Sequence, residues 1–220
     1  STTISAADLL LAINKGDNTL AVVDAATLKV LGIAPTGPDP HEVLASPDGK
    51  LAFITNYSLA NTISVIDLVA HKALPPINLG VLLRPHGLAV EGGKLYFTAE
   101  GAKAIGRYDL ATGRVDWVLG TGQNRTHILT VSPDLKRVIT VNPASASVSF
   151  LDEIAVTMPN PQRITSDWVV TTLPAGRGAE GFDLSPNGKE LWVANAQDGT
   201  VSIIDPIGRK LLETVTVPLK

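Results

Sequence analysis

The 220-residue sequence contains no cysteine, so disulfide frameworks and thiolate metal sites are excluded. Charged residues make up only 18% of the chain and hydrophobic residues 45%, a balance that argues against intrinsic disorder. No apolar run approaches the length of a membrane-spanning helix, so we expect no membrane span. The formal net charge of −3 argues against a nucleic-acid partner held by a general basic surface.

The sequence does contain an internal repeat, and three markers define it. The first is an apolar run that ends in Asp, with steps of 43, 42, 43 and 53 residues between Asp24, Asp67, Asp109, Asp152 and Asp205. The second is a tight turn of the Ser-Pro-Asp-Gly type that begins at Ser46, Ser132 and Ser185. The third closes an apolar run, at Asn14, Asn56, Glu100, Asn142 and Asn195. Three markers with one period predict one repeated structural unit.

Each unit holds four short apolar runs separated by turn residues, which is typical of a β-propeller blade. We therefore predict an all-β propeller of four-stranded antiparallel blades, in a single domain over residues 1–220. The blade units are expected at about 1–37, 38–80, 81–122, 123–176 and 177–220. No innermost strand precedes Leu9, so the first unit is predicted to lack it. The chain is then either part of a larger propeller or paired with a second copy at its open edges.

The fourth unit is longer than the others because of extra residues between Asp152 and Trp168. Two prolines in this segment, Pro159 and Pro161, are incompatible with a central strand. We therefore expect a long loop there.

Three strand ends, Phe53-Ile54-Thr55-Asn56, Ile139-Thr140-Val141-Asn142 and Trp192-Val193-Ala194-Asn195, resemble the Tyr-Val-Thr-Asn motif of the YVTN-family propeller proteins. The Ser-Pro-Asp-Gly turns and the Val-Ile-Asp strand end are similar too, and the resemblance spans nearly the whole chain. Thr98-Ala99-Glu100 departs from the motif, which marks the third blade as modified. The resemblance implies a secreted, periplasmic or cell-surface protein of bacteria or archaea, most often with seven blades. It implies little about chemistry, because propellers serve as lyases, lactonase-like enzymes, redox partners and scaffolds.

Strand direction sorts the loops of an up-and-down blade onto two faces. The segments before the inner strands and the loops after the second strands share one face, here called the top face. The Ser-Pro-Asp-Gly turns and the Asp strand ends share the bottom face. The five Asp side chains are expected to accept backbone hydrogen bonds in the following turn, which is a structural role.

Three of the four histidines occupy one repeat position on the top face, just before an inner strand. They are His41, His86 and His127, and Glu180 takes this position in the fifth unit, whereas His71 lies in a bottom loop. Because inner strands line the channel of a propeller, we predict that these four side chains ring its mouth. Imidazole and carboxylate groups together would suit zinc or another divalent first-row metal. The alternative is a repeated structural role, a hydrogen bond to the neighbouring blade.

Arginines recur beside this position. Arg84 and Arg125 each lie two residues before a histidine, and Arg177 lies three residues before Glu180. Repeated guanidinium groups near a channel mouth would suit a small anionic ligand such as a carboxylate or phosphate. Ion pairs between blades are the alternative.

No complete catalytic constellation is visible, because the sequence has neither a nucleophile-elbow motif nor a phosphate-binding glycine loop. The sequence therefore favours a non-catalytic binding module of secreted or cell-surface type, with a protein or a small anionic ligand bound at the top face. A divalent metal is the one cofactor that it suggests. The alternative is a propeller enzyme, lactonase-like or metal-assisted and hydrolytic, that uses the histidines and Glu180 at the channel mouth.

Overall fold

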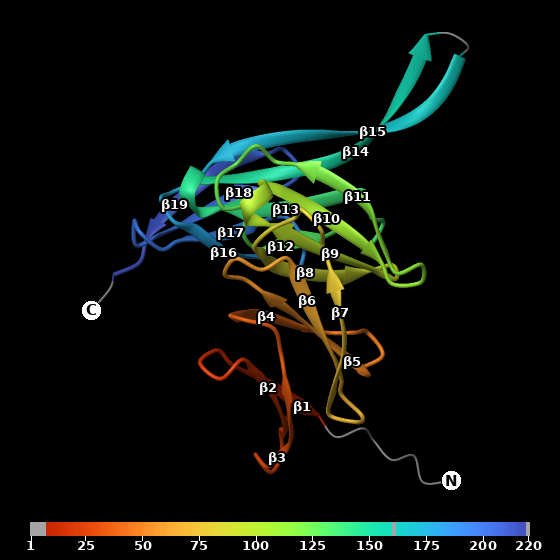
Figure 1. Ribbon diagram of the computed structural model, residues 1–220. Helices are drawn as coiled ribbons and strands as arrows, with labels where there is room; N and C mark the ends of the chain where they lie inside the picture. The colour runs from red at the N-terminus through yellow and green to blue at the C-terminus, as the bar shows by residue number, and fades with distance from the viewer. Residues whose placement is uncertain (1–7, 160–161, 219–220) are drawn as a thin grey trace, which may run out of the picture. The chain divides into compact units, whose positions relative to one another are not determined.

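The computed structural model describes residues 8–159 and 162–218. Residue contacts divide the chain into two compact units, Ser1–Leu88 and Ala89–Lys220, and each is described by itself. Strands dominate both units (Figure 1). The helical segments in the described part of the chain are two single-turn 3₁₀ helices, η1 (Glu100–Ala102) and η2 (Pro143–Ser145). Neither has the length or the apolar character that a membrane-spanning helix requires.

The first unit contains two sheets in which strands adjacent in the chain pair antiparallel. The three-stranded sheet consists of β1 (Leu9–Asn14), β2 (Thr19–Asp24) and β3 (Val30–Pro35). The four-stranded sheet consists of β4 (Pro40–Ala45), β5 (Leu51–Asn56), β6 (Thr62–Asp67) and β7 (Lys72–Asn78). Within the described residues, the first sheet therefore lacks a strand on the inner side of β1, as the sequence predicted.

Three further four-stranded sheets follow in the same order. The first consists of β8 (Pro85–Glu91), which crosses the boundary between the units, β9 (Lys94–Ala99), β10 (Ala104–Asp109) and β11 (Arg114–Gly120). The next consists of β12 (Leu129–Val131), β13 (Arg137–Asn142), β14 (Ser147–Pro159) and β15 (Gln162–Pro174). The last consists of β16 (Ala179–Leu184), β17 (Leu191–Asn195), β18 (Thr200–Asp205) and β19 (Lys210–Thr216).

The core of each unit lies between neighbouring sheets, on the middle strands. In the first unit, Leu20 and Val22 pack with Ile54 and Ile66 of the next sheet, and all four are fully buried. In the second unit, β13 and β14 are covered on one side by a cluster that includes Tyr96 and on the other by a cluster with strands β17 and β18. Middle strands therefore read as continuous apolar runs, whereas the outermost strand β19 is exposed throughout.

The repeated asparagine ties the end of the second strand of a sheet to the third strand. Asn56 donates from Nδ2 to Thr62 Oγ1 (2.8 Å) and Ser64 Oγ (3.0 Å) while fully buried. The other three asparagines make equivalent bonds: Asn14 to Thr19, Asn142 to Ser147 and Ser149, and Asn195 to Thr200 and Ser202. The motif is therefore structural, because it satisfies a buried amide inside the sheet.

Strand pairing in the third blade shows that Glu100 was assigned to the asparagine position of the repeat by mistake. Asn56 stands opposite Thr62, the first residue of the third strand, and the residue opposite the corresponding Ala104 is Ala99. The repeat position in the third blade is thus Ala99, and Glu100 is the next residue along, at the start of η1. Glu100 therefore has no asparagine-like role and is available for other contacts.

The bottom-face Asp side chains accept backbone N–H groups of the following turn in four of the five sheets, which confirms the prediction for them. Asp67 Oδ1, for example, accepts from Val69 and Ala70 at 2.8 Å each. Asp24, Asp109 and Asp205 bind their turns in the same way. Asp152 differs because β14 runs on through it without a turn, and the prediction is wrong there. Its carboxylate instead joins Arg137 (2.5 Å) and Arg209.

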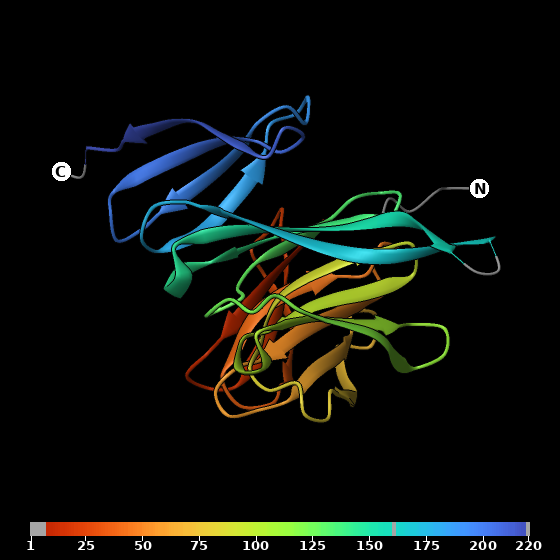
Figure 2. The ribbon, with the colours of Figure 1, turned by 90° about the horizontal axis from the view of Figure 1, so that it is seen from above.

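The extra residues of the fourth unit form a two-stranded ribbon, so the predicted loop is wrong. β14 and β15 are 13 residues long and pair from Ser147↔Pro174 to Pro159↔Gln162, whereas β13 accompanies β14 only as far as Asp152. Figures 1 and 2 both show the ribbon extending past its sheet. Pro159 is tolerated because it lies at the end of the ribbon, beyond the last residue that β13 pairs. Pro161 lies outside the described residues.

Candidate functional site

A left-handed residue precedes each of the four predicted top-face positions by two residues. The φ angles are 53° at Asp39, 58° at Arg84, 55° at Arg125 and 70° at Gly178. A non-glycine residue pays about 1–2 kcal/mol for this conformation, so tertiary contacts hold it in three of the four cases. The same backbone device therefore starts the inner strand of each of these blades and sets the direction of His41, His86, His127 and Glu180.

The centre of the site in the second unit is a buried histidine–carboxylate pair. His127 Nδ1 lies 2.7 Å from Glu100 Oε1, and their side chains are 5% and 1% exposed. Glu100 comes from η1 after β9, and His127 comes from the segment before β12. The His127 backbone is fixed on both sides, because its N–H donates to Val141 O and its carbonyl accepts from Thr98 Oγ1. The pair thus bridges two adjacent blades.

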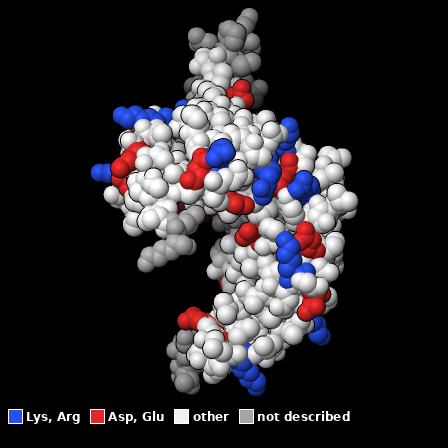
Figure 3. All heavy atoms as spheres, turned by 90° about the vertical axis from the view of Figure 1, so that its left-hand side faces the viewer, with Lys and Arg blue, Asp and Glu red and all other residues white. Residues whose placement is uncertain are grey.

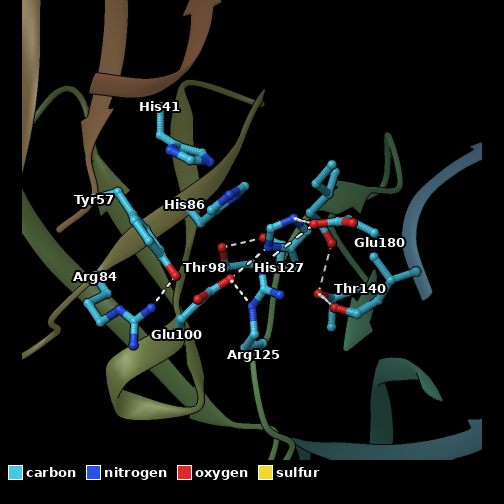
Figure 4. A network of polar contacts seen from close by, with 12 residues as sticks. His41, Tyr57, Arg84, His86, Thr98, Glu100, Arg125, His127, Thr140 and Glu180 are labelled. Atoms are coloured by element: carbon cyan, nitrogen blue, oxygen red, sulfur yellow. Dashed lines mark hydrogen bonds and ion pairs between the residues drawn. The ribbon is translucent and has the colours of Figure 1, made fainter. Parts of the chain in front are cut away.

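Arg125 and Glu180 extend this pair toward solvent (Figure 4). Glu180, on β16 of the next sheet, places Oε1 3.4 Å from His127 Nε2 and 3.6 Å from Arg125 Nη2. Arg125 Nε also lies 3.6 Å from Glu100 Oε1. The side chains of Arg125 and Glu180 are 41% and 47% exposed. These four residues, from three sheets, are called the top-face network below.

The hydrogen-bond geometry assigns one proton of the imidazole. An ionised carboxylate only accepts, so the 2.7 Å contact with Glu100 places a proton on Nδ1 of His127. The other nitrogen, Nε2, faces the Glu180 carboxylate at 3.4 Å. Two lone pairs that face each other repel, so a cation or a hydrogen-bond donor placed between Nε2 and the Glu180 carboxylate would relieve this repulsion.

Formal charge in the top-face network favours a cation over an anion. Two carboxylates, Glu100 and Glu180, flank the single guanidinium of Arg125 at equal distances. Arg125 therefore pairs with acids of neighbouring blades, which is the alternative that the sequence left open for the arginines. An anionic ligand bound at this point would be repelled by both carboxylates.

The first unit carries an aromatic cluster at the equivalent positions. The ring of His41 lies 4.4 Å from His86 and 4.9 Å from Tyr57, measured between centroids. Arg84 stacks over the Tyr57 ring at 4.7 Å and donates from Nη2 to the Tyr57 hydroxyl (Figure 4). His86 is buried, and the other members are partly exposed. The structure thus brings His41, His86 and Arg84 together around Tyr57.

One set of site residues was missed by the sequence reasoning. In the first three blades, the residue directly after the second strand contacts the next blade: Lys15 lies 2.7 Å from His41 Nδ1 and 2.9 Å from Asp39, Tyr57 contacts Arg84, and Glu100 contacts Arg125. The hydrogen bond from Lys15 lowers the pKa of Asp39. The available signal was position, because each of these residues follows the asparagine marker or its equivalent.

Arg177, which the sequence placed beside Glu180, and His71, the fourth histidine, both lie outside the top-face network. Arg177 pairs with Asp198 of its own blade at 2.7 Å and is 73% exposed, so no described contact joins it to Glu180. His71 adopts a left-handed φ of 53° in the turn after β6, four residues beyond Asp67. Leu28, Gly113 and Arg209 hold the same turn position and the same conformation in their blades, so the role of His71 is structural.

Donor chemistry for a metal is present in both units. His86 in the first unit, and Glu100 and His127 in the second, are buried side chains that each offer one ligand atom. A His/Glu/His set can bind a divalent first-row ion. Convergence of His41, His86, His127 and Glu180 on one channel mouth remains a prediction.

Charged side chains of both signs are interspersed on the face of the molecule that Figure 3 shows. Lys and Arg atoms lie close to Asp and Glu atoms there, and no broad patch of one sign stands out. Charge on this face is therefore organised locally and forms no broad field of one sign.

Comparison with known proteins identifies the fold. No family model matches the chain, and no curated protein matches it by sequence. Solved structures do match. Hydrazine synthase of Kuenenia stuttgartiensis aligns with a TM-score of 0.58 and 17% identity, over 95% of this chain and 83% of that one. The dihydro-heme d1 dehydrogenase NirN aligns with a TM-score of 0.68 and 16% identity, over 99% and 46%. A putative 6-phosphogluconolactonase from Bacteroides uniformis aligns with a TM-score of 0.71 and 18% identity, over 97% and 69%.

These similarities, together with the successive antiparallel sheets, define the class: the chain has the β-propeller fold, with sheets as blades. Such identities show the fold alone. The named proteins have different activities, so the fold does not choose among them. The resemblance to the YVTN family remains a prediction, since no family model matches.

Proposed function

We propose that this chain is a non-catalytic binding module of the propeller class whose top-face network binds a divalent first-row metal ion. One observation carries the proposal: Nε2 of the buried His127, oriented through Nδ1 by Glu100, faces Oε1 of Glu180 at 3.4 Å. A carboxylate behind a metal-binding imidazole fixes its tautomer and raises its basicity. Glu100 therefore has the position of an orienting group, and His127 and Glu180 have the positions of ligands.

The spacing of the two ligand atoms fits a tetrahedral ion. Zinc binds imidazole nitrogen and carboxylate oxygen at about 2.0–2.2 Å, which sets two ligands about 3.3–3.5 Å apart at the tetrahedral angle. The His127 Nε2 to Glu180 Oε1 separation of 3.4 Å falls in this range. The exposure of Glu180 leaves room for water or a bound partner to complete the coordination sphere.

The competing occupant is a proton. An imidazolium at His127 would form ion pairs with both carboxylates and make the network a structural joint between blades. Arg125 supports this alternative. Its guanidinium lies near Glu180 and repels a divalent ion more strongly than the single charge of an imidazolium. Metal binding must therefore be measured directly.

The test is equilibrium dialysis of the purified chain against Zn²⁺, with metal analysis of both compartments. We expect one ion per chain at the top-face network, and a loss of affinity of at least about tenfold in His127→Ala and in Glu180→Gln. His71→Asn is the matched control, because it removes a histidine from a bottom turn and asparagine tolerates the left-handed conformation there. Absence of stoichiometric binding, or binding by His127→Ala equal to that of the unsubstituted chain, would reject the proposal.

The same assay tests the repeat-based prediction for the first unit. If His41 and His86 serve the same ion, His41→Ala and His86→Ala also lower the affinity. If only the second unit binds, their affinities equal that of the control.

A second candidate function rests on the same geometry. A zinc ion held by two protein ligands keeps open positions for water, and zinc-bound water ionises near neutral pH, which supports hydrolysis. This function corresponds to the lactonase-like or metal-assisted hydrolytic enzyme that the sequence left as the alternative. Hydrolysis of a panel of lactones with Zn²⁺ present, abolished in His127→Ala, would favour it over a binding module.

We infer the location from the sequence resemblance and the assembly from the open strand edges. We propose a secreted, periplasmic or cell-surface protein, with further blades or a second copy at the edge of β1 and at the exposed strand β19. Fractionation of the source cells tests the location.

A further inference from the structure

We propose that the arm, residues 153–159 of β14 and 162–168 of β15, joins two copies of this chain by pairing the outer edges of their β15 strands. The arm consists of the seven residue pairs that lie beyond the last partner of β13, from Glu153↔Trp168 to Pro159↔Gln162. None of its residues belongs to the top-face network, so the inference does not depend on the proposed metal.

The arm is an unusual element because only two strands pair in it, beyond the last residue of β14 that β13 accompanies. Its base is anchored by Trp168, whose ring lies 4.8 Å from Trp117. Further out, Ile154 is 42% exposed, and Ala155, Thr157, Thr165 and Ser166 are exposed as well. An isolated two-stranded ribbon is at best marginally stable in water, so a further strand paired with this ribbon, which is rich in β-branched residues, would stabilise it.

At the outer edge of β15, alternate backbone groups point away from β14, toward the position that such a strand would take. The Glu153 N–H donates to Lys136 O on the inner side of β14, so the residue opposite it, Trp168, directs its N–H outward. That N–H is met by the Asp167 side chain at 2.7 Å, and by no strand among the described residues. Ser166, two residues away, has the same outward direction.

The sequence of this edge is complementary to itself in charge. Antiparallel pairing of two β15 strands about Thr165 places Thr165 opposite Thr165, and Asp167 of one copy opposite residue 163, an arginine, of the other. The two-fold axis repeats this opposite-charge pair on the other side. Thr–Thr pairs and opposite charges are favourable cross-strand neighbours, each by about 0.2–1 kcal/mol. The occupant of this edge is therefore a second copy of the chain.

The test is a charge exchange followed by light scattering on a gel-filtration column across a range of concentrations. The unsubstituted chain should show a concentration-dependent dimer. Asp167→Arg sets arginine opposite arginine twice and should weaken the dimer by at least about tenfold. Arg163→Asp combined with Asp167→Arg restores opposite charges and should restore the dimer, which also shows that the single variant did not merely unfold.

A matched control is Asp183→Arg, at an exposed position outside the arm, which should leave the dimer unchanged. A chain that is monomeric at all concentrations would overturn the inference. A dimer that is insensitive to Asp167→Arg, or a double variant that remains monomeric, would overturn it as well. In either case metal binding at His127 remains a separate measurement.

Discussion

Replacement of Glu100 by glutamine is the most informative perturbation of the top-face network. Glutamine has nearly the same size and shape as glutamate, so packing around η1 is kept while the charge behind His127 is removed. The Glu100 side chain is 1% exposed, and water therefore cannot replace the lost carboxylate. The substitution isolates the effect of the negative charge on His127, because the glutamine oxygen can still accept from Nδ1 and Glu100 is not placed as a direct ligand.

The size of the effect follows from the 2.7 Å contact between Glu100 Oε1 and His127 Nδ1. A hydrogen bond to an ionised acceptor is roughly twice as strong as one between neutral groups. Loss of an outer-shell carboxylate typically lowers metal affinity about 10- to 100-fold, which is about 1.4–2.7 kcal/mol. Glu100→Gln should therefore bind Zn²⁺ about 10- to 100-fold more weakly than the unsubstituted chain.

The assay is calorimetric titration of Zn²⁺ into both proteins at one pH, with Glu180→Gln measured in parallel. Urea unfolding of each variant checks that the fold is retained. Glu180→Gln removes a proposed ligand, so its affinity should fall at least as far as that of Glu100→Gln. Equal Zn²⁺ affinity in Glu100→Gln and the unsubstituted chain would refute the reasoning, since it would show that the carboxylate charge behind His127 does not strengthen metal binding.

Three further predictions concern the framework around the site. Asp152→Asn should lower the free energy of unfolding by about 2–3 kcal/mol, because the side chain is only 10% exposed and its carboxylate joins Arg137 of its own blade to Arg209 of the next; the urea midpoint measures it. Hydrogen bonding to Lys94 holds the pKa of Asp109 at about 2, below its ordinary 3.8, so its stabilising effect is complete above about pH 4 and is lost as the pH falls toward 2. Asp109→Asn should therefore flatten the loss of stability over that interval, and an unchanged acid-unfolding profile would contradict this. Gly106→Ala should cost about 1–3 kcal/mol, because its Cβ would lie 2.2 Å from the Phe97 ring; an unshifted melting temperature would show that the ring moves aside freely.

The repeat was readable from the sequence because each marker has a local physical cause. Asparagine recurs because its amide binds the threonine or serine that starts the next strand, as Asn56 binds Thr62. Asp67 recurs because it accepts N–H groups two and three residues later. Such contacts lie within a few residues in the chain, so the fold class and the strand order follow from the pattern alone.

A departure from the repeat pointed to the candidate site. The sequence showed that the third blade breaks the asparagine motif, and the structure shows Glu100 just after that break, paired with a buried histidine. The exact position was misassigned by one residue, because only the strand register distinguishes Ala99 from Glu100 as the equivalent of asparagine.

The extra segment of the fourth blade was misread for a different reason. Proline is excluded from a strand that has partners on both sides, and sequence alone does not reveal whether a third strand is present. In the structure β13 ends its pairing at Asp152, so Pro159 lies at the end of a free ribbon.

The sequence by itself therefore determined the blade, its turns and the repeat position of the four top-face side chains. Only the tertiary structure decided which of these side chains meet. Glu100, Arg125, His127 and Glu180 come from three different blades, and their distances depend on how the sheets pack. Local hydrogen bonds are encoded within a few residues of chain, whereas a contact between blades depends on every buried side chain between them.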